Sequence, residues 1–454
     1  MIKLLNKVWN ILFPTDLPYK RMLTIMYVWF FTIVLNYITK YIFEIGISPS
    51  IYFPFSMFKP MFHVSGLPYA FLFIFVVYFA IKYKLHNSII STYMMGIFLI
   101  VLGNMSLGNM ELAFVNPIAG GDLQYYHDAI KIDSWQNWLS TFNSAQESLL
   151  CHAKTHPPGA LLIEKLFFTI SKSPIWISVV FLFLSSISIV LIYKIFIELG
   201  KDKIFSNKMA LLYAVIPSVN IYSLATLDAV IAMLVNIVVL GVIIIMESQQ
   251  KQRLIIWGVL SAASISLVSL LTFASIYLWG VIGVFSFYLF YFYSNKKILI
   301  LLSISFILFL GTILFLDQVY DYNYVESFFT ASRLENPHGF MLFSEPLNYF
   351  ATRIEDIFEI AIFLSLGVTA VLTTIKHKLQ NNLYIILSLI AISMLLLMFL
   401  SGAYRTGETA RACLFIVSFI LIFLKDIPNS LLTSLISFAA LQTILMQILG
   451  FYFW

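Results

Sequence analysis

The chain has 454 residues, of which 61% are hydrophobic, 17% aromatic and only 11% charged, and its mean hydropathy is +0.92. This composition excludes an ordinary soluble domain and is typical of a polytopic integral membrane protein. The net charge of +5 does not indicate a nucleic-acid partner, because the basic residues are dispersed between apolar segments, where membrane orientation accounts for them.

The first residues predict an amphipathic helix that lies on the membrane surface over 1–20. Lys3 and Lys7 precede only a brief apolar run, which ends at Pro14 and Asp16, so the pattern does not indicate a cleaved signal peptide.

Apolar segments long enough to cross a bilayer core of roughly 30 Å recur along the chain. They predict an all-α transmembrane bundle of about thirteen spans, with outer-face loops and short interfacial helices. The segments are 22–44, 68–84, 89–109, 174–199, 208–224, 228–246, 254–272, 275–293, 298–316, 357–375, 383–402, 412–425 and 428–450. The run 160–170 is also apolar, but it is short and carries Glu164 and Lys165, so we expect an interfacial or re-entrant helix that does not cross.

The lysines and arginines lie mostly in every second connection, which the positive-inside rule assigns to the cytoplasm. These cytoplasmic residues are Lys3, Lys7, Lys20, Arg21, Lys82, Lys84, Lys194, Lys201, Lys203, Lys208, Lys251, Arg253, Lys296, Lys297, Lys376, Lys378 and Lys425. The polar segments then share the outer face, where we expect the function. They are 110–159, 225–228, 272–275, 317–356 and 402–411.

The first long outer loop contains the best candidate for a catalytic carboxylate. Asp122 follows Gly120 and Gly121, and it could cap a short helix, act as a base, or do both. Asp128 is the second candidate.

A rigid turn, His156-Pro157-Pro158-Gly159, ends that loop and holds His156 at its start. His152 and His156 have the i, i+4 spacing of metal ligands, but the prolines leave little helix to present them, and no metal site is predicted. Cys151 and Cys413 are expected to be unpaired.

The last outer connection contains Arg405, Glu408 and Arg411 at the mouth of two apolar helices. Two interpretations stay open. The arginines could bind phosphate, or they could form ion pairs with Glu408 that join the helix ends.

Together these features resemble the GT-C superfamily of polytopic glycosyltransferases. The resemblance rests on the acidic motif at Asp122, the His-Pro-Pro-Gly turn, the segment from Pro217 to Asp228-Ala229, and Gly-Glu-x-x-Arg at 407–411. It covers most of 110–425. In many members the acidic loop follows the first span, whereas here it follows the third, so the role of 1–109 is left open.

The resemblance implies transfer of a sugar from a polyprenyl-phosphate donor to a glycan, lipid or protein acceptor, with inversion. It implies Asp122 as the general base, with Asp128 as the other catalytic candidate, and no cofactor or metal is expected. The expected substrate-binding residues are Tyr125, Tyr126, His127, Lys154, His156, Arg405, Glu408 and Arg411. The tyrosines could also belong to an ordinary interfacial aromatic belt.

The resemblance also implies a catalytic domain over 1–425, with N-terminal spans 1–109 and the acidic outer loop 110–172, followed by a C-terminal transmembrane helix in 426–454. The expected location is a bacterial or archaeal plasma membrane, with the active site on the outer face and a role in the cell envelope. Membrane lipid is a partner and nucleic acid is not.

Two other classes remain possible from the sequence. A polysaccharide polymerase or ligase would use outer-loop arginines, among them Arg333 and Arg353, on lipid-diphosphate-linked glycans. A secondary transporter would carry ionisable residues near the bilayer midplane, but the centres of the spans are almost free of charge. No nucleotide-binding motif indicates a nucleotide-sugar donor.

Overall fold

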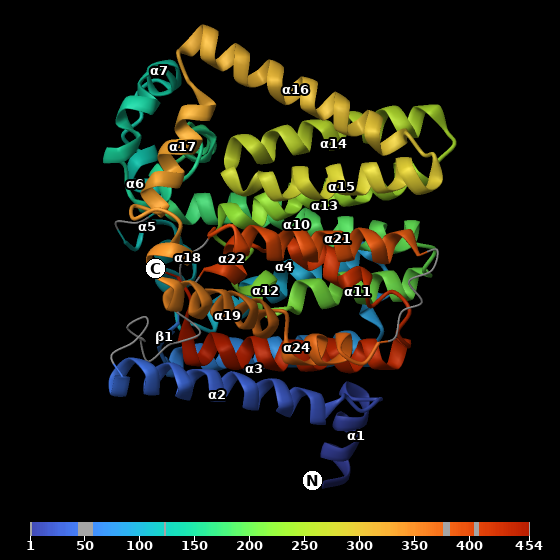
Figure 1. Cartoon of the computed structure of the whole chain (residues 1–454). Coiled ribbons are helices and arrows are strands. Elements are labelled where there is room, and N and C mark those ends of the chain that lie inside the picture. The colour runs from blue at the N-terminus through green and yellow to red at the C-terminus, as the bar shows by residue number, and fades with distance from the viewer. Residues whose placement is uncertain (1, 44–57, 122–123, 376–381, 404–407, 454) are drawn as a thin grey trace.

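The computed structural model describes residues 2–43, 58–121, 124–375, 382–403 and 408–453, with side chains from residue 6 onward. The described secondary structure is almost entirely helical, which confirms the predicted all-α class. Figure 1 shows the long helices lying side by side along one direction, as expected for a polytopic membrane protein.

Nine helices among the described residues are long and apolar enough to cross a membrane, and they correspond to nine of the predicted spans. A 21-residue helix extends about 31 Å, which matches the hydrocarbon thickness of a bilayer. The nine are α2 (Tyr19–Phe43), α3 (Leu67–Lys82), α10 (Pro174–Glu198), α13 (Leu227–Glu247), α14 (Lys251–Leu271), α15 (Ile276–Tyr293), α16 (Lys297–Tyr320), α21 (Leu383–Leu400) and α24 (Asn429–Leu449).

The other four predicted spans are one shorter helix and three interrupted ones. The helices are α4 (Ile89–Met105), α11 (Lys203–Val215) with α12 (Pro217–Tyr222), α19 (Pro346–Phe363) with α20 (Leu366–Leu372), and α22 (Thr409–Ala412) with α23 (Ile416–Ile422). Pro217 interrupts the first pair, because the residue before a proline is forced out of the helical region, and Ile216 has ψ 134°. Ser365, with φ +80°, separates α19 from α20.

Short elements gather at one end of the bundle, on the left of Figure 1, where α5, α6, α7, α17 and α18 are labelled. Their bounds are α5 (Asn116–Ala119), α6 (Tyr126–Ala129), α7 (Trp135–Ala145), α8 (Cys151–Lys154), α9 (Gly159–Phe167), α17 (Tyr324–Glu335) and α18 (Met341–Ser344). At the opposite end the helices are joined by short connections, several of them basic, such as Lys82–Lys84, Lys201–Lys203 and Lys296–Lys297. The polar loops therefore share one end of the molecule, as the sequence predicted.

Helix α9 covers the apolar run for which no crossing was expected. It has nine residues, so it extends only about 13 Å, less than half of a bilayer core. Gly159 at its start permits a close approach, because a Cβ there would lie 2.3 Å from the Leu270 carbonyl oxygen. The helix thus packs against the end of α14 without spanning the membrane.

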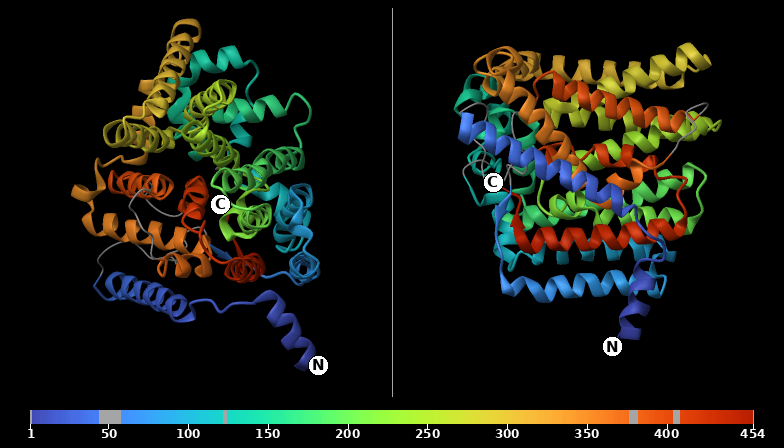
Figure 2. Two further views of the ribbon diagram at one scale, coloured as in Figure 1. Left: turned by 90° about the vertical axis from the view of Figure 1, so that its right-hand side faces the viewer. Right: turned by 60° about the horizontal axis from the view of Figure 1, so that its bottom comes forward.

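Helix α13 packs on both α10 and α14. In its most apolar stretch of 18 residues, 89% is buried inside the protein. The corresponding values are only 11% for α2 and 17% for α16. In Figures 1 and 2 these two helices lie at opposite edges of the bundle. Helix α13 therefore forms the core, whereas α2 and α16 present apolar surface outward.

The two ends of the chain are tied to the same bundle. Helix α24 packs on α3 and α11, and strand β1 (Lys59–Pro60) pairs antiparallel with strand β2 (Gly450–Phe451). The amphipathic helix α1 (Ile2–Leu12) also contacts α3 and α24. The division at 425 into a catalytic domain and a C-terminal helix stays a prediction.

Candidate functional site

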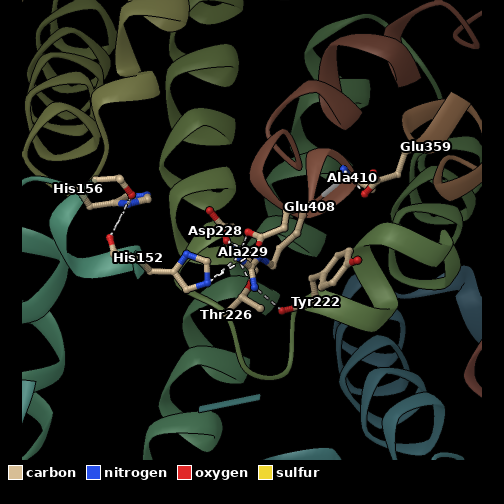
Figure 3. A network of polar contacts seen from close by, with 11 residues as sticks. His152, His156, Tyr222, Thr226, Asp228, Ala229, Glu359, Glu408 and Ala410 are labelled. Atoms are coloured by element: carbon tan, nitrogen blue, oxygen red, sulfur yellow. Dashed lines mark hydrogen bonds and ion pairs between the residues drawn. The ribbon is translucent and has the colours of Figure 1, made fainter. Parts of the chain in front are cut away.

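The site begins at the N-terminus of α13, where a carboxylate enters an otherwise apolar helix. Thr226 caps this helix, since its Oγ1 accepts a hydrogen bond from the Ala229 amide (3.3 Å). Asp228 therefore lies in the first turn, where unpaired amides and the helix dipole favour negative charge. Figure 3 shows its side chain directed toward those of Glu408 and His152.

Arg411 joins this carboxylate to a second one. Arg411 Nε lies 3.3 Å from Asp228 Oδ2, and Arg411 Nη2 donates to Glu408 Oε2. The arginine is buried, with 7% of its surface exposed. A guanidinium keeps its charge in proteins, and here Glu408 and Asp228 compensate it. One buried cation is therefore matched by two carboxylates.

His152, from α8, completes the cluster in its neutral form. Its Nε2 lies 3.5 Å from Arg411 Nη2 and 3.7 Å from Glu408 Oε1. Burial, and then Arg411, holds the pKa of His152 well below its usual range. In the neutral ring, the unprotonated Nε2 accepts a hydrogen bond from Arg411. His152 therefore forms no ion pair with Glu408.

His156 lies beside this cluster, at the turn that the sequence singled out. Its Nδ1 donates to the His152 carbonyl oxygen (2.9 Å), and its ring meets that of Tyr125 edge to face at 5.3 Å. Burial lowers the pKa of His156 to about 4. Both histidines are therefore neutral at physiological pH.

Acidic residues of α19 hold the short helix α22 in place. Glu359 Oε1 accepts from the Ala410 amide (3.0 Å), and Asp356 Oδ1 accepts from the Thr409 hydroxyl (2.5 Å). Arg353 in turn pairs with Asp356 at 3.1 Å. These contacts satisfy donors at the start of α22 that have no partner within the helix. Glu408, the residue before α22, has a left-handed backbone conformation (φ +63°). The contacts from α19 fix the direction in which Arg411 leaves the backbone.

Three spaces lie at or beside the site, and two of them share lining residues. A small cavity of about 20 Å³ is lined by Tyr125, Glu164, Asp228 and Arg411 among others. On the other side of the Tyr125–His156 contact, a pocket of about 300 Å³ includes His156, Glu335 and Asn336. That pocket shares Phe273, Ile276 and Phe328 with an apolar groove of about 290 Å³, whose other residues include Trp279, Phe309 and Val325.

The structure brings together four of the predicted site residues, namely Tyr125, His156, Glu408 and Arg411. Arg411 pairs with Glu408, as one of the two interpretations expected, and the binding of phosphate by an arginine of this segment stays a prediction. Asp122 and Arg405, together with Gly407 of the predicted motif, lie outside the described residues, although Gln124, close after Asp122, lines the small cavity.

The remaining predicted residues lie elsewhere in the outer loop. Asp128 Oδ2 accepts from the Leu150 amide (2.8 Å) and its Oδ1 pairs with Lys131, so it fastens two parts of the loop. The Tyr126 hydroxyl donates to the Lys172 carbonyl oxygen, and His127 meets the Tyr126 ring edge to face. Lys154 follows His152 at the end of α8 and is half-buried.

Three residues of the site, two in the cluster and one in the adjoining small cavity, were not among the predicted site residues. Asp228 could have been found, because it is the one acid in the first turn of a long apolar helix. His152 was considered only as a metal ligand, and Glu164 only as an interruption of an apolar run. Among the described residues, no group of three or more His, Cys, Asp or Glu side chains is arranged to hold a metal ion.

Comparison of the chain with protein-family models, with curated proteins and with solved structures finds no match.

Proposed function

We propose that the protein is an integral membrane glycosyltransferase that moves a sugar from a polyprenyl-phosphate donor to a hydroxyl of a glycan, lipid or protein acceptor. The observation that carries this proposal is that a pocket and a groove with different linings adjoin each other. A pocket whose lining includes the polar side chains of His156, Glu335 and Asn336 continues through three shared side chains into a groove that is almost wholly apolar.

An amphiphilic substrate fits this junction better than a wholly polar or wholly apolar one. The groove is lined by aromatic and aliphatic side chains of α15, α16 and α17, some of them strongly exposed, such as Val325 (54%). A hydrocarbon tail placed there removes apolar surface from both water and headgroups. Its polar head then reaches His156, which contacts Tyr125 at the edge of the Arg411 cluster.

In the proposed transfer step, a carboxylate acts as the base and an arginine stabilises the departing phosphate. Asp122 removes the proton from the acceptor hydroxyl, the new bond forms at the anomeric carbon, and the bond to the polyprenyl phosphate breaks on the opposite face. Arg411 already has two carboxylate partners, so its role is to organise the site, and Arg405 is left to stabilise the departing phosphate.

The distribution of charge supports an orientation with the site outside the cytoplasm. The end of the bundle that carries Lys82, Lys201 and Lys296 has the short basic connections that the positive-inside rule places in the cytoplasm. With α4 and the three interrupted pairs counted as crossings, the chain spans the membrane about thirteen times. The Arg411 cluster then faces the extracytoplasmic side, where lipid-linked sugars are available to it.

A polymerase or ligase acting on a lipid diphosphate is the second candidate, and one observation favours it. Arg333 is exposed beside a pocket of about 550 Å³ that shares Ser332, Asn336 and Ser401 with the His156 pocket. A guanidinium there could bind a diphosphate. Interrupted helices also occur in transporters, but in those proteins the polar groups lie near the midplane, whereas this cluster lies at one end of the bundle.

The test uses the full chain in proteoliposomes with polyprenyl-phosphate hexoses and pentoses that carry a radiolabelled sugar, and an envelope extract as acceptor. We expect label to leave one donor and appear in acceptor with inverted anomeric configuration. Turnover only of diphosphate-linked glycans would support the ligase, and uptake of intact labelled sugar would support a transporter. Absence of both binding and turnover with every donor would contradict the proposal.

A further inference from the structure

Glu164 is a buried carboxyl group for which the transfer mechanism above has no use. It lies on α9 with only 3% of its surface exposed, and it lines the small cavity that Asp228 and Arg411 also line. A carboxylate so deeply buried is costly unless a cation or several donors compensate it.

No such compensation is present within the described part of the chain. Glu164 Oε2 has no hydrogen-bond partner there, and neither has Nε2 of the buried Gln124, which lines the same cavity. Among the described residues that line the cavity, Arg411 is the one cation, and it is already paired with Asp228 and Glu408. A third negative charge at Glu164 would therefore exceed what one guanidinium can balance.

The groups that face Glu164 from neighbouring elements do not change this conclusion. Tyr125 and Tyr126 come from α6 and the residue before it, Asp228 from α13, and Arg411 from α22. The charged residues of α10 and α14, which also pack on α9, lie at the opposite end of the bundle. Burial raises the pKa of Glu164 to about 8, so the neutral acid is the main form at pH 7.

The size of the cavity limits what it can hold. Its volume of about 20 Å³ admits one water molecule or one hydroxyl group and excludes a sugar ring. Two residues that line this cavity carry an unpaired polar atom, a carboxylic acid that can donate or accept at Glu164 and an amide N–H that donates at Gln124. Because an unpaired buried donor is costly, such a site binds a ligand with an oxygen at this position much more tightly than an analogue without it.

We propose that Glu164 works as a neutral carboxylic acid and that, with Gln124, it forms a subsite for one hydroxyl group beside Asp228 and Arg411. This subsite rests on the proposed function for the identity of its ligand, which is a hydroxyl of the donor sugar or of the acceptor, and it holds water when substrate is absent. Ionisation of Glu164 leaves excess negative charge near the site and weakens binding of an anionic donor. Donor affinity therefore falls as the pH rises through the titration of Glu164.

Infrared spectroscopy of the full chain in nanodiscs tests the protonation state without any substrate. We expect a carboxylic acid C=O band that titrates near pH 8, is present in the wild type and is missing from Glu164→Gln. Glu147→Gln, which changes an exposed carboxyl of the same loop, serves as the matched control and should leave the band unchanged. A wild-type spectrum at pH 7 with no band that Glu164→Gln removes would overturn the proposal.

Addition of ligand tests the hydroxyl subsite. A shift of the Glu164 band on addition of a polyprenyl-phosphate sugar alone assigns the hydroxyl to the donor, and a shift on addition of a short glycan acceptor alone assigns it to the acceptor. No shift with either, in protein that turns over the same substrates, would overturn the subsite. If the band titrates as expected but no sugar is bound or transferred, the protonation state stands and the proposed function is wrong.

Discussion

Asp228 Oδ2 lies 3.3 Å from Arg411 Nε, and this contact joins the first turn of α13 to α22 across the candidate site. The two residues are far apart in the sequence, and each lies at the start of an apolar segment, so their side chains meet where two helices reach the polar end of the bundle. Glu408 binds the same guanidinium. This arrangement makes Arg411 the residue on which the charge balance of the site depends.

Arg411→Ala is expected to destabilise the protein by about 3–5 kcal/mol, because it leaves two buried carboxylates without their cation. The measurement is the free energy of unfolding in detergent, from the shift of the denaturation midpoint. Arg253→Ala is the matched control, since Arg253 pairs with Glu198 at the opposite end with 41% of its side chain exposed, and there we expect a loss of about 0–1 kcal/mol. Equal losses in the two variants would contradict a central role for Arg411.

Arg405→Ala is expected to leave the fold intact and weaken binding of a polyprenyl-phosphate sugar by about 2–5 kcal/mol, because it removes a direct phosphate contact. The affinity is measured by titration of the labelled donor into the purified protein. If it changes by less than about twofold, or roughly 0.4 kcal/mol, the phosphate is held by another cation. Lys154 and Arg333 are then the next to substitute, since Arg353 is buried against Asp356.

Much of the fold was predictable because apolar length is a property of the sequence. The ends of the spans near Phe43, Leu271 and Leu400 agree with the predicted segments to within a few residues. The interruptions were harder to predict. Pro217 carries a local signal, but Ser365, with φ +80°, is an ordinary residue whose conformation depends on what packs around it.

The site was predictable where a motif marked it and not where tertiary contacts make it. Glu408 and Arg411 are three residues apart, so their pairing follows from helical spacing. The approach of His152 and Glu164 to that pair depends on how the outer loop folds back, which no local pattern encodes. Asp128 was the second catalytic candidate in the sequence, and the structure shows that its oxygens bind Leu150 and Lys131.

Asp122→Asn and Asp128→Asn should therefore have different effects. We expect Asp122→Asn to abolish sugar transfer in protein that inserts and folds normally, because the amide cannot accept the proton of the acceptor hydroxyl. Asp128→Asn should retain the chemistry and make the loop around Leu150 easier to cleave by protease, since the one oxygen of an amide cannot both accept from the Leu150 amide and form the ion pair with Lys131. Turnover near the wild-type rate in Asp122→Asn would exclude it as the base and direct attention to Asp128.

The orientation of the bundle can be tested by labelling single cysteines after Cys151 and Cys413 have been replaced. Cysteine at Ser144 should react with a membrane-impermeant thiol reagent in intact cells, and cysteine at Gln250 should react only after permeabilisation. Both positions are exposed and lie at opposite ends of the bundle. Ser144 is preferred to its neighbour Asn143, whose amide binds the Asn323 backbone. The reverse labelling would place the whole candidate site in the cytoplasm.

The apolar groove gives the last prediction, which separates lipid-tail binding from chemistry. Val325→Trp places a larger side chain in the groove and should displace part of the tail. Loss of about two buried methylene groups costs roughly 1.6 kcal/mol, or about a fifteenfold rise in the KM for the lipid donor. The kcat should change little, because the groove binds the tail equally in the ground state and the transition state.

Ile307→Trp is the control for this change. Ile307 lies on α16 and is 69% exposed, but it is not among the residues that line the groove. It should leave the KM for every donor unchanged, and a donor with a short, water-soluble tail should bind the wild type and Val325→Trp equally well. If Val325→Trp weakened the short-tailed donor as much as the long-tailed one, the effect would come from distortion of α17 and the adjoining His156 pocket, and the groove would not hold the tail.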